Sequence, residues 1–94
     1  MRTRDSRYRI IKPLLNEGQI TSFLDIFEYI PKSVVAADLG KKVDRFTELM
    51  NRIEKFTVEE LLIIAGFCNL SITEMFRLVE NEYTKRRLLF THHR

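Results

Sequence analysis

The 94-residue chain contains one cysteine, two prolines, three glycines and no tryptophan, and it has no long apolar run. One cysteine excludes a disulfide framework within the chain, and three scattered glycines exclude a glycine-rich phosphate loop. A membrane helix needs about 18 apolar residues in sequence, so no membrane partner is expected. With 45% hydrophobic and 31% charged residues the chain is not disordered either. We expect one soluble globular domain in the cytoplasm.

Residues that carry catalysis or bind metals are also scarce. The two histidines, His92 and His93, are adjacent near the C-terminal end, where a catalytic base is hard to orient. They form no spaced zinc set with Cys68, whose apolar neighbours predict a buried side chain. Two acidic pairs are expected to be solvated charges on helix surfaces: Glu59 with Glu60, and Glu80 with Glu82. No enzyme activity, metal or cofactor is therefore expected.

The net charge of +3 is distributed unevenly along the chain. Residues 1–12 carry five basic and one acidic side chain, and residues 84–94 carry four basic and no acidic ones. Residues 13–83 carry seven basic and twelve acidic side chains. We expect a basic N-terminal arm or short extra helix over 1–18, a folded domain over 19–83 and a basic C-terminal tail over 84–94. Such arms are either simply solvated or contact DNA phosphates and the minor groove.

Apolar residues recur at helical spacing through the central domain, and no strand-like alternation competes with them. The first predicted helix, about ten residues long, carries Ile20, Phe23, Leu24 and Phe27. Ser33 is expected to cap a second helix over 34–39, which Gly40 ends in a left-handed conformation. The third has a polar outer side and an apolar stripe that consists of Val43, Phe46, Leu49, Met50 and Ile53.

Two capping boxes predict the remaining helices. Thr57 and Glu60 precede a nearly all-apolar helix over 61–68, and Ser71 and Glu74 open another. The apolar face of this last helix is predicted to be Ile72, Met75, Phe76, Val79 and Tyr83. Residues 7–17 form a short helix or an arm, because the position before Pro13 disfavours helix. The expected fold is all-α, a compact bundle of about five short helices with basic arms.

Ala36 and Gly40 have the spacing that a helix-turn-helix requires. A small residue at position 36 lets two helix backbones approach, and Gly40 permits the tight turn between the helices. The apolar residues expected to lock the pair are Val35, Leu39, Phe46 and Leu49.

At these residues the chain resembles the Cro and phage-repressor type of helix-turn-helix, the lambda-repressor-like fold. Residues 32–40 look like the first motif helix and turn of that family, and residues 43–53 look like its recognition helix, with Asn51 near its end. Residues 56–62 and 70–76 are similar to the two helices that follow. The resemblance spans about residues 20–80 and implies a bacterial or phage-type transcriptional regulator that binds double-stranded DNA.

The resemblance also implies roles for individual residues between Lys32 and Thr57. The residues implied to face the bases are Lys42, Val43, Asp44, Arg45 and Glu48. Those implied to contact the DNA backbone or groove wall are Lys32, Ser33, Asn51, Arg52, Lys55 and Thr57. The implied motif framework is Ala36, Leu39, Gly40, Phe46 and Leu49. Segment 32–55 has six basic and four acidic residues, so its charge has the sign that DNA requires.

Three departures from the family keep alternatives open. Asp44 and Glu48 place carboxylates on the reading face, where they accept from cytosine but repel phosphate. Lys41 stands where the family has an apolar residue. The alternative function is a protein-interaction module, antitoxin-like or structural, that keeps the fold without tight DNA binding. Ile63 and Phe67 form an apolar pair on the fourth helix, which either the N-terminal segment covers or a homodimer uses; residues 88–90 pose the same question.

Overall fold

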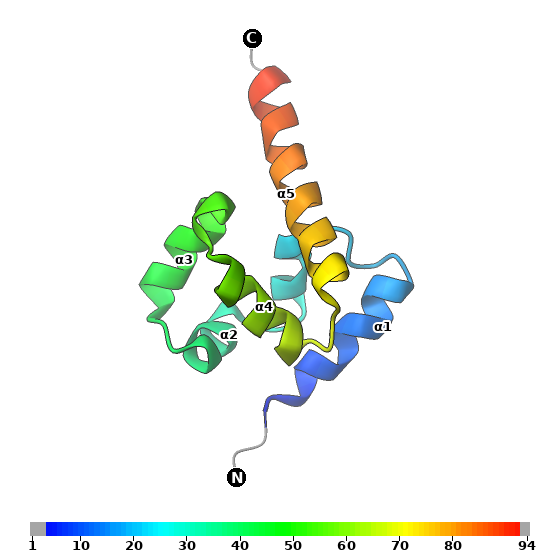
Figure 1. Ribbon diagram of the computed structural model, residues 1–94, viewed down its shortest axis with the longest axis vertical. Helices are drawn as coiled ribbons and strands as arrows, with labels where there is room; N and C mark the ends of the chain where they lie inside the picture. Colours follow the sequence, from blue (N-terminus) through cyan, green and yellow to red (C-terminus); the bar gives the residue numbers. More distant parts are fainter. Residues whose placement is uncertain (1–3, 93–94) are drawn as a thin grey trace.

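Every element is helical in the part of the chain that the structure describes. The computed structural model describes the backbone of residues 4–92 and the side chains of residues 4–87. The elements are the 3-10 helices η1 (Ser6–Ile10), η2 (Phe23–Glu28) and η3 (Ile53–Lys55), and the α-helices α1 (Ile11–Asn16), α2 (Lys32–Leu39), α3 (Val43–Asn51), α4 (Val58–Phe67) and α5 (Ile72–His92). The predicted all-α fold is confirmed. Figure 1 shows α2 and α3 on one side of α4 and α1 on the other.

Four phenylalanines form the centre of the core on the α3 side. Phe23 and Phe27 of η2 meet Phe46 of α3 and Phe56, and each ring contacts two others edge to face with centroids 5.3 to 5.6 Å apart. Each such pair contributes about 0.5–1.5 kcal/mol beyond the area it buries. The cluster therefore fixes α3 to η2, although η2 is short.

Helix α4 lies at the centre of the bundle. The Thr57 hydroxyl accepts from the Glu60 amide at 3.1 Å and the Glu60 carboxylate accepts from the Thr57 amide at 2.8 Å, which confirms the predicted capping box. Ile64 and Ala65 are buried. Among the described residues no single helix is long and apolar enough to cross a membrane; α4 and α5 pass that test only together, across a bend of 115°.

The N-terminal segment is folded from Ser6 onward rather than being an arm. The buried Tyr8 hydroxyl donates to Asp38 of α2 at 2.8 Å, and the Tyr8 ring packs on Phe67 of α4. Lys12 pairs with Glu74 of α5. Pro13 is tolerated in the first turn of α1, where an amide has no partner within the helix, so the expected bias against helix at Lys12 is wrong.

Two other predicted boundaries also differ from the structure. The helix expected over about ten residues is the six-residue η2, because the Asp25 carboxylate binds the amides of Thr21 and Ser22 and Ser22 stays extended. Helix α2 begins at Lys32, after Pro31. Ser33 is therefore the second residue of α2 and not its cap.

Helix α5 differs most from expectation. It continues to His92, so the segment expected to be a separate tail from residue 84 is helical, and Figure 1 shows this end projecting from the bundle. Met75, Leu78 and Glu82 face the core. Three residues predicted for the buried face are instead exposed, with 56%, 39% and 43% of their surfaces accessible: Ile72, Phe76 and Tyr83.

Candidate nucleic-acid interface

The turn between α2 and α3 is built around Gly40. Its φ and ψ of 82° and 26° lie in the left-handed region, where other residues are strained. The Gly40 amide donates to the Ala37 carbonyl at 3.1 Å and the Lys41 amide donates to the Ala36 carbonyl at 2.8 Å. This pair of bonds is the Schellman arrangement that ends a helix sharply. The turn therefore gives α3 a defined direction relative to α2.

Buried residues attach α2 and α3 to each other and to α4. Ala36 has no accessible surface, and α2 contacts both α3 and α4. Phe46 and Leu49 point inward from α3 and are buried, while Leu39 is half-buried against the core. Four of the five predicted framework residues are thus buried or half-buried where α2 and α3 meet the core, and the fifth, Gly40, forms the turn.

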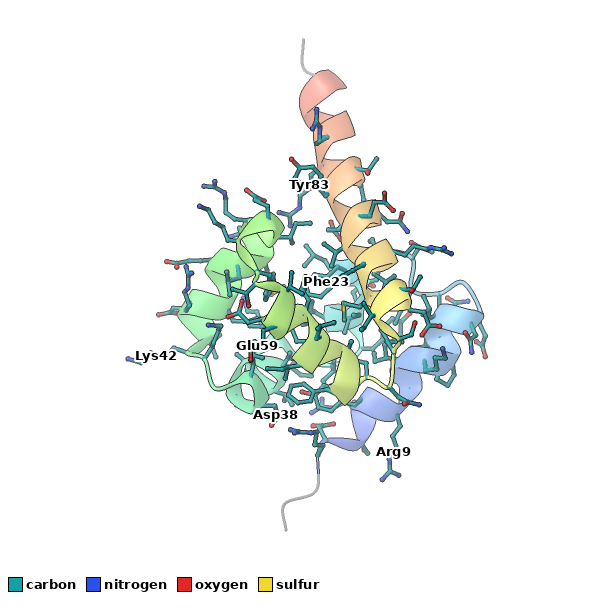
Figure 2. All side chains as sticks on the ribbon, in the orientation of Figure 1. Arg9, Phe23, Asp38, Lys42, Glu59 and Tyr83 are labelled. Atoms are coloured by element: carbon teal, nitrogen blue, oxygen red, sulfur yellow. The ribbon has the colours of Figure 1, made fainter. Side chains whose placement is uncertain are left out.

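The opposite side of α3 is uncovered. Figure 2 shows Lys42, at the start of α3, pointing away from the bundle. The residues predicted to face bases are all exposed: Lys42, Val43, Asp44, Arg45 and Glu48. Asn51, the last residue of α3, is also exposed, as are Arg52 and Lys55 after the helix. The structure brings these residues together on one side of the molecule.

Ion pairs occupy two of the arginines on this surface. Arg45 pairs with Glu48 at 3.1 Å and Arg52 pairs with Glu54 at 3.1 Å, with all four side chains largely exposed. Exposed pairs of this kind stabilise a protein by only about 0.2–1 kcal/mol. Both guanidinium groups are therefore available to an anionic partner at small cost.

The residues predicted to contact the DNA backbone differ in exposure and in the hydrogen bonds that they already make. Ser33 is exposed at the start of α2 and Lys32 is half-buried. Thr57 is exposed, but its hydroxyl oxygen serves as the cap of α4. That hydroxyl still has a proton to donate.

Lys41 connects the turn to α4. Its ammonium lies 2.7 Å from the Glu60 carboxylate. Burial opposes ionisation of Glu60, but the hydrogen bonds from Lys41 and the Thr57 amide outweigh it and lower the pKa of this carboxyl. Lys41 thus holds the turn to α4 by charge.

Glu82 and Arg86 of α5 support α3 from the side that faces the bundle. This role was not predicted from the sequence for either residue. Glu82 is only 4% exposed, so its predicted place on a solvated surface is wrong. One of its oxygens accepts from the Leu24 amide at 3.0 Å, and the other lies 3.7 Å from Arg86 Nε. Arg86 donates to the carbonyls of Met50 and Asn51 at 2.6 and 2.7 Å. A side chain of α5 therefore caps the C-terminal end of α3.

Two of the remaining candidate residues, Phe67 and Cys68, are packed inside the described part of the chain. Phe67 is covered by the Tyr8 ring and by the Arg4 guanidinium, 4.1 Å from its centroid, whereas Ile63 stays 41% exposed. Cys68 is buried as predicted, and burial raises the pKa of its thiol to about 12. The described side chains of residues 4–87 include no group of three placed to hold a metal ion. Predictions that concern Arg2, His93 and the side chains of residues 88–92 lie outside the described residues.

Comparison with known proteins adds no relative to this description. No protein-family model matches the chain, and neither a curated protein nor a solved structure matches it. The inference of function therefore rests on the exposed polar side of α3 and on the contacts that hold α3 through Gly40, the phenylalanine cluster and Arg86.

Proposed function

We propose that the protein binds double-stranded DNA sequence-specifically, with the α2–α3 pair as a helix-turn-helix of the lambda-repressor-like type. One observation carries the proposal: Phe46 and Leu49 bury one side of α3, while its other side is exposed and, apart from Val43, polar. An α-helix fits the major groove of B-DNA, with its N-terminal residues at the base edges. A bacterial or phage-type transcriptional regulator is the class that this arrangement fits.

The exposed residues of α3 have the chemistry to read base edges. Arg45 suits the two acceptors of guanine, and Val43 suits the methyl group of thymine. Asp44 and Glu48 accept hydrogen bonds and so favour the amino group of cytosine. The reading helix should therefore prefer G·C-containing sites, with the carboxylates excluding bases that present only acceptors.

Residues on either side of α3 supply the contacts to the phosphates. Lys32 and Ser33 lie at the start of α2, and Arg52 and Lys55 follow the end of α3. Asn51 and Thr57 provide neutral polar groups in the same region. The segment 32–55 has six basic and four acidic residues, although residues 13–83 as a whole are acidic.

Fluorescence anisotropy with duplex DNA across a salt series tests the proposal. If Lys32, Arg52 and Lys55 each neutralise one phosphate, the logarithm of affinity should fall with the logarithm of salt concentration with a slope of about −3. Random duplex reports the phosphate contacts, and selection from a random-sequence pool reports base preference. Absence of binding at low salt would falsify the proposal.

A second candidate function rests on the acidic residues of the same face. Asp44 and Glu48 are exposed, and Glu48 already pairs with Arg45, so this mixed surface also fits a protein partner. In that case the fold is an interaction module, antitoxin-like or structural. Such a module shows no DNA binding at low salt, and Asp44→Ala weakens its protein complex.

A further inference from the structure

Helix α5 carries an apolar stripe on the side that faces away from the core. Ile72, Phe76 and Tyr83 are exposed, and Val79 lies half-buried between the last two. These positions follow each other at intervals of four, three and four residues, the spacing of the seam between two paired helices. The stripe thus has the pattern of a helix that packs on another helix.

A groove lies beside this stripe. It has a volume of about 360 Å³, and its apolar lining comes from Ile53 of η3 and from Phe76, Val79 and Tyr83 of α5. Two carboxylates, those of Glu54 and Glu80, stand at its edge. Its occupant should therefore be apolar and carry basic groups along one side.

The projecting end of α5 has these properties. Figure 1 shows the helix extending beyond the bundle, and no other element lies beside its last turns. Arg87 is exposed on this end and packs over the Tyr83 ring at 5.9 Å. Helix α5 continues through position 90, which is a phenylalanine in the sequence.

The order of charges along α5 selects an antiparallel arrangement. Glu80 and Arg87 are seven residues apart and so lie on the same flank of the stripe. When two such helices run antiparallel, identical flanking positions face each other, and Glu80 of one copy meets Arg87 of the other. In a parallel pair the flank opposite Arg87 would need Glu82, which is buried against Leu24 and Arg86.

We infer that α5 pairs antiparallel with α5 of a second copy, about a twofold axis at Tyr83. The projecting end of each helix fills the groove of the other copy, and two Glu80–Arg87 pairs close the flanks. The contact is isologous, so it ends at the dimer. It forms in the absence of DNA and does not rest on the proposed DNA binding.

Cross-linking of two cysteine variants tests the arrangement directly. Tyr83→Cys places two thiols at the axis, so mild oxidation should give a covalent dimer. Ile72→Cys is the matched control, because the antiparallel pair holds the two copies of residue 72 about 33 Å apart. The native Cys68 is buried and should not compete. Cross-linking of both variants, or of Ile72→Cys alone, would overturn the antiparallel arrangement.

Charge exchange tests the same contact without new thiols. Glu80→Arg and Arg87→Glu should each weaken the dimer about tenfold in sedimentation equilibrium, since each places like charges together twice. The double variant should restore wild-type association, and Arg77→Glu, which has the same charge change on another side of α5, should have no effect. The inference is wrong if the wild-type chain stays monomeric at high micromolar concentration. It is equally wrong if the chain stays monomeric and the Arg87→Glu variant loses DNA affinity, because nucleic acid is then the partner of this face.

Discussion

Helices α3 and α5 each have one side buried and one side uncovered, but their uncovered sides have opposite character. On α3 this side holds charged and polar residues, with Val43 as the apolar exception. On α5 it holds Ile72, Phe76 and Tyr83 in a continuous stripe. Charged side chains are well solvated and attract a partner of opposite charge, such as nucleic acid. A large exposed apolar stripe instead favours contact with another protein surface. The two helices therefore point to partners of different chemistry.

Polar contacts from the inner side of α5 connect it to the C-terminal end of α3. Arg86 and Glu82 of α5 bind the end of α3 and the start of η2. The orientation of α3 thus depends on a helix that lies outside the α2–α3 pair. Substitutions on the inner and outer sides of the two helices can separate support from recognition.

The largest effect is expected for Arg86→Ala. The variant leaves the Glu82 carboxylate buried without its cation and frees two carbonyls of α3, so it should destabilise the fold by about 3 kcal/mol. Arg77→Ala, on the exposed side of α5, should change stability by less than about 0.5 kcal/mol. Chemical denaturation followed by circular dichroism measures both. Equal stability of the two variants would show that the inner contact does not support α3.

The second largest effect is expected for Ala36→Val. This variant should lower the free energy of unfolding by about 2 kcal/mol, because the larger side chain overpacks the space between α2 and its neighbours. Ala37→Val is the matched control, because Ala37 is exposed on the same helix and has the same change in helix propensity. Thermal unfolding of the two variants isolates the packing contribution. A stability for Ala36→Val equal to that of the control would remove the structural basis for a tight helix pair.

Substitution of both Arg45 and Arg52 by alanine should reduce DNA affinity about tenfold, or 1.4 kcal/mol, without a change in thermal unfolding. Both side chains are exposed on the outer surface, so the bundle does not need them. Anisotropy at fixed salt gives the affinity. A variant that unfolds early but binds DNA normally would assign this surface to stability instead.

The smallest effect concerns the contact of α1 with α5. The hydrogen bond from Lys12, followed by that from the Ser71 amide, lowers the pKa of the Glu74 carboxyl. A lowered pKa means that the contact stabilises the fold above the unfolded-state pKa and loses this contribution as pH falls through the folded-state value. Lys12→Ala should therefore cost about 0.5 kcal/mol at neutral pH and almost nothing in acid. Thermal unfolding of the wild type and of Lys12→Ala at neutral and acid pH measures this difference. A loss of stability that is the same at both pH values would contradict the role of charge.

The sequence alone predicts the elements whose signals are local. Gly40 ends α2, and Thr57 with Glu60 opens α4, because a left-handed turn and a capping box depend on residues within one turn of each other. The exposed side of α3 follows from the alternation of polar residues with Phe46 and Leu49 in the same way.

The inner side of α5 was not predictable from apolar spacing. Three of the five residues on the predicted apolar face of this helix are exposed, and the core side contains Glu82, which periodicity assigns to solvent. Only the four-residue spacing between Glu82 and Arg86 indicated a pair, and spacing alone does not place the pair inside. Its burial depends on Leu24 and Asn51, which lie far away in the sequence.

The hydrogen bonds from Arg86 to the last carbonyls of α3 have a thermodynamic consequence. The residue belongs to α5, which we assign to a second copy of the chain, and it binds α3, which we assign to DNA. We expect a shift of either helix to reach the other through this side chain and so to couple the two proposed association equilibria. Because such coupling is reciprocal, the factor by which a second copy strengthens DNA binding equals the factor by which DNA strengthens the dimer.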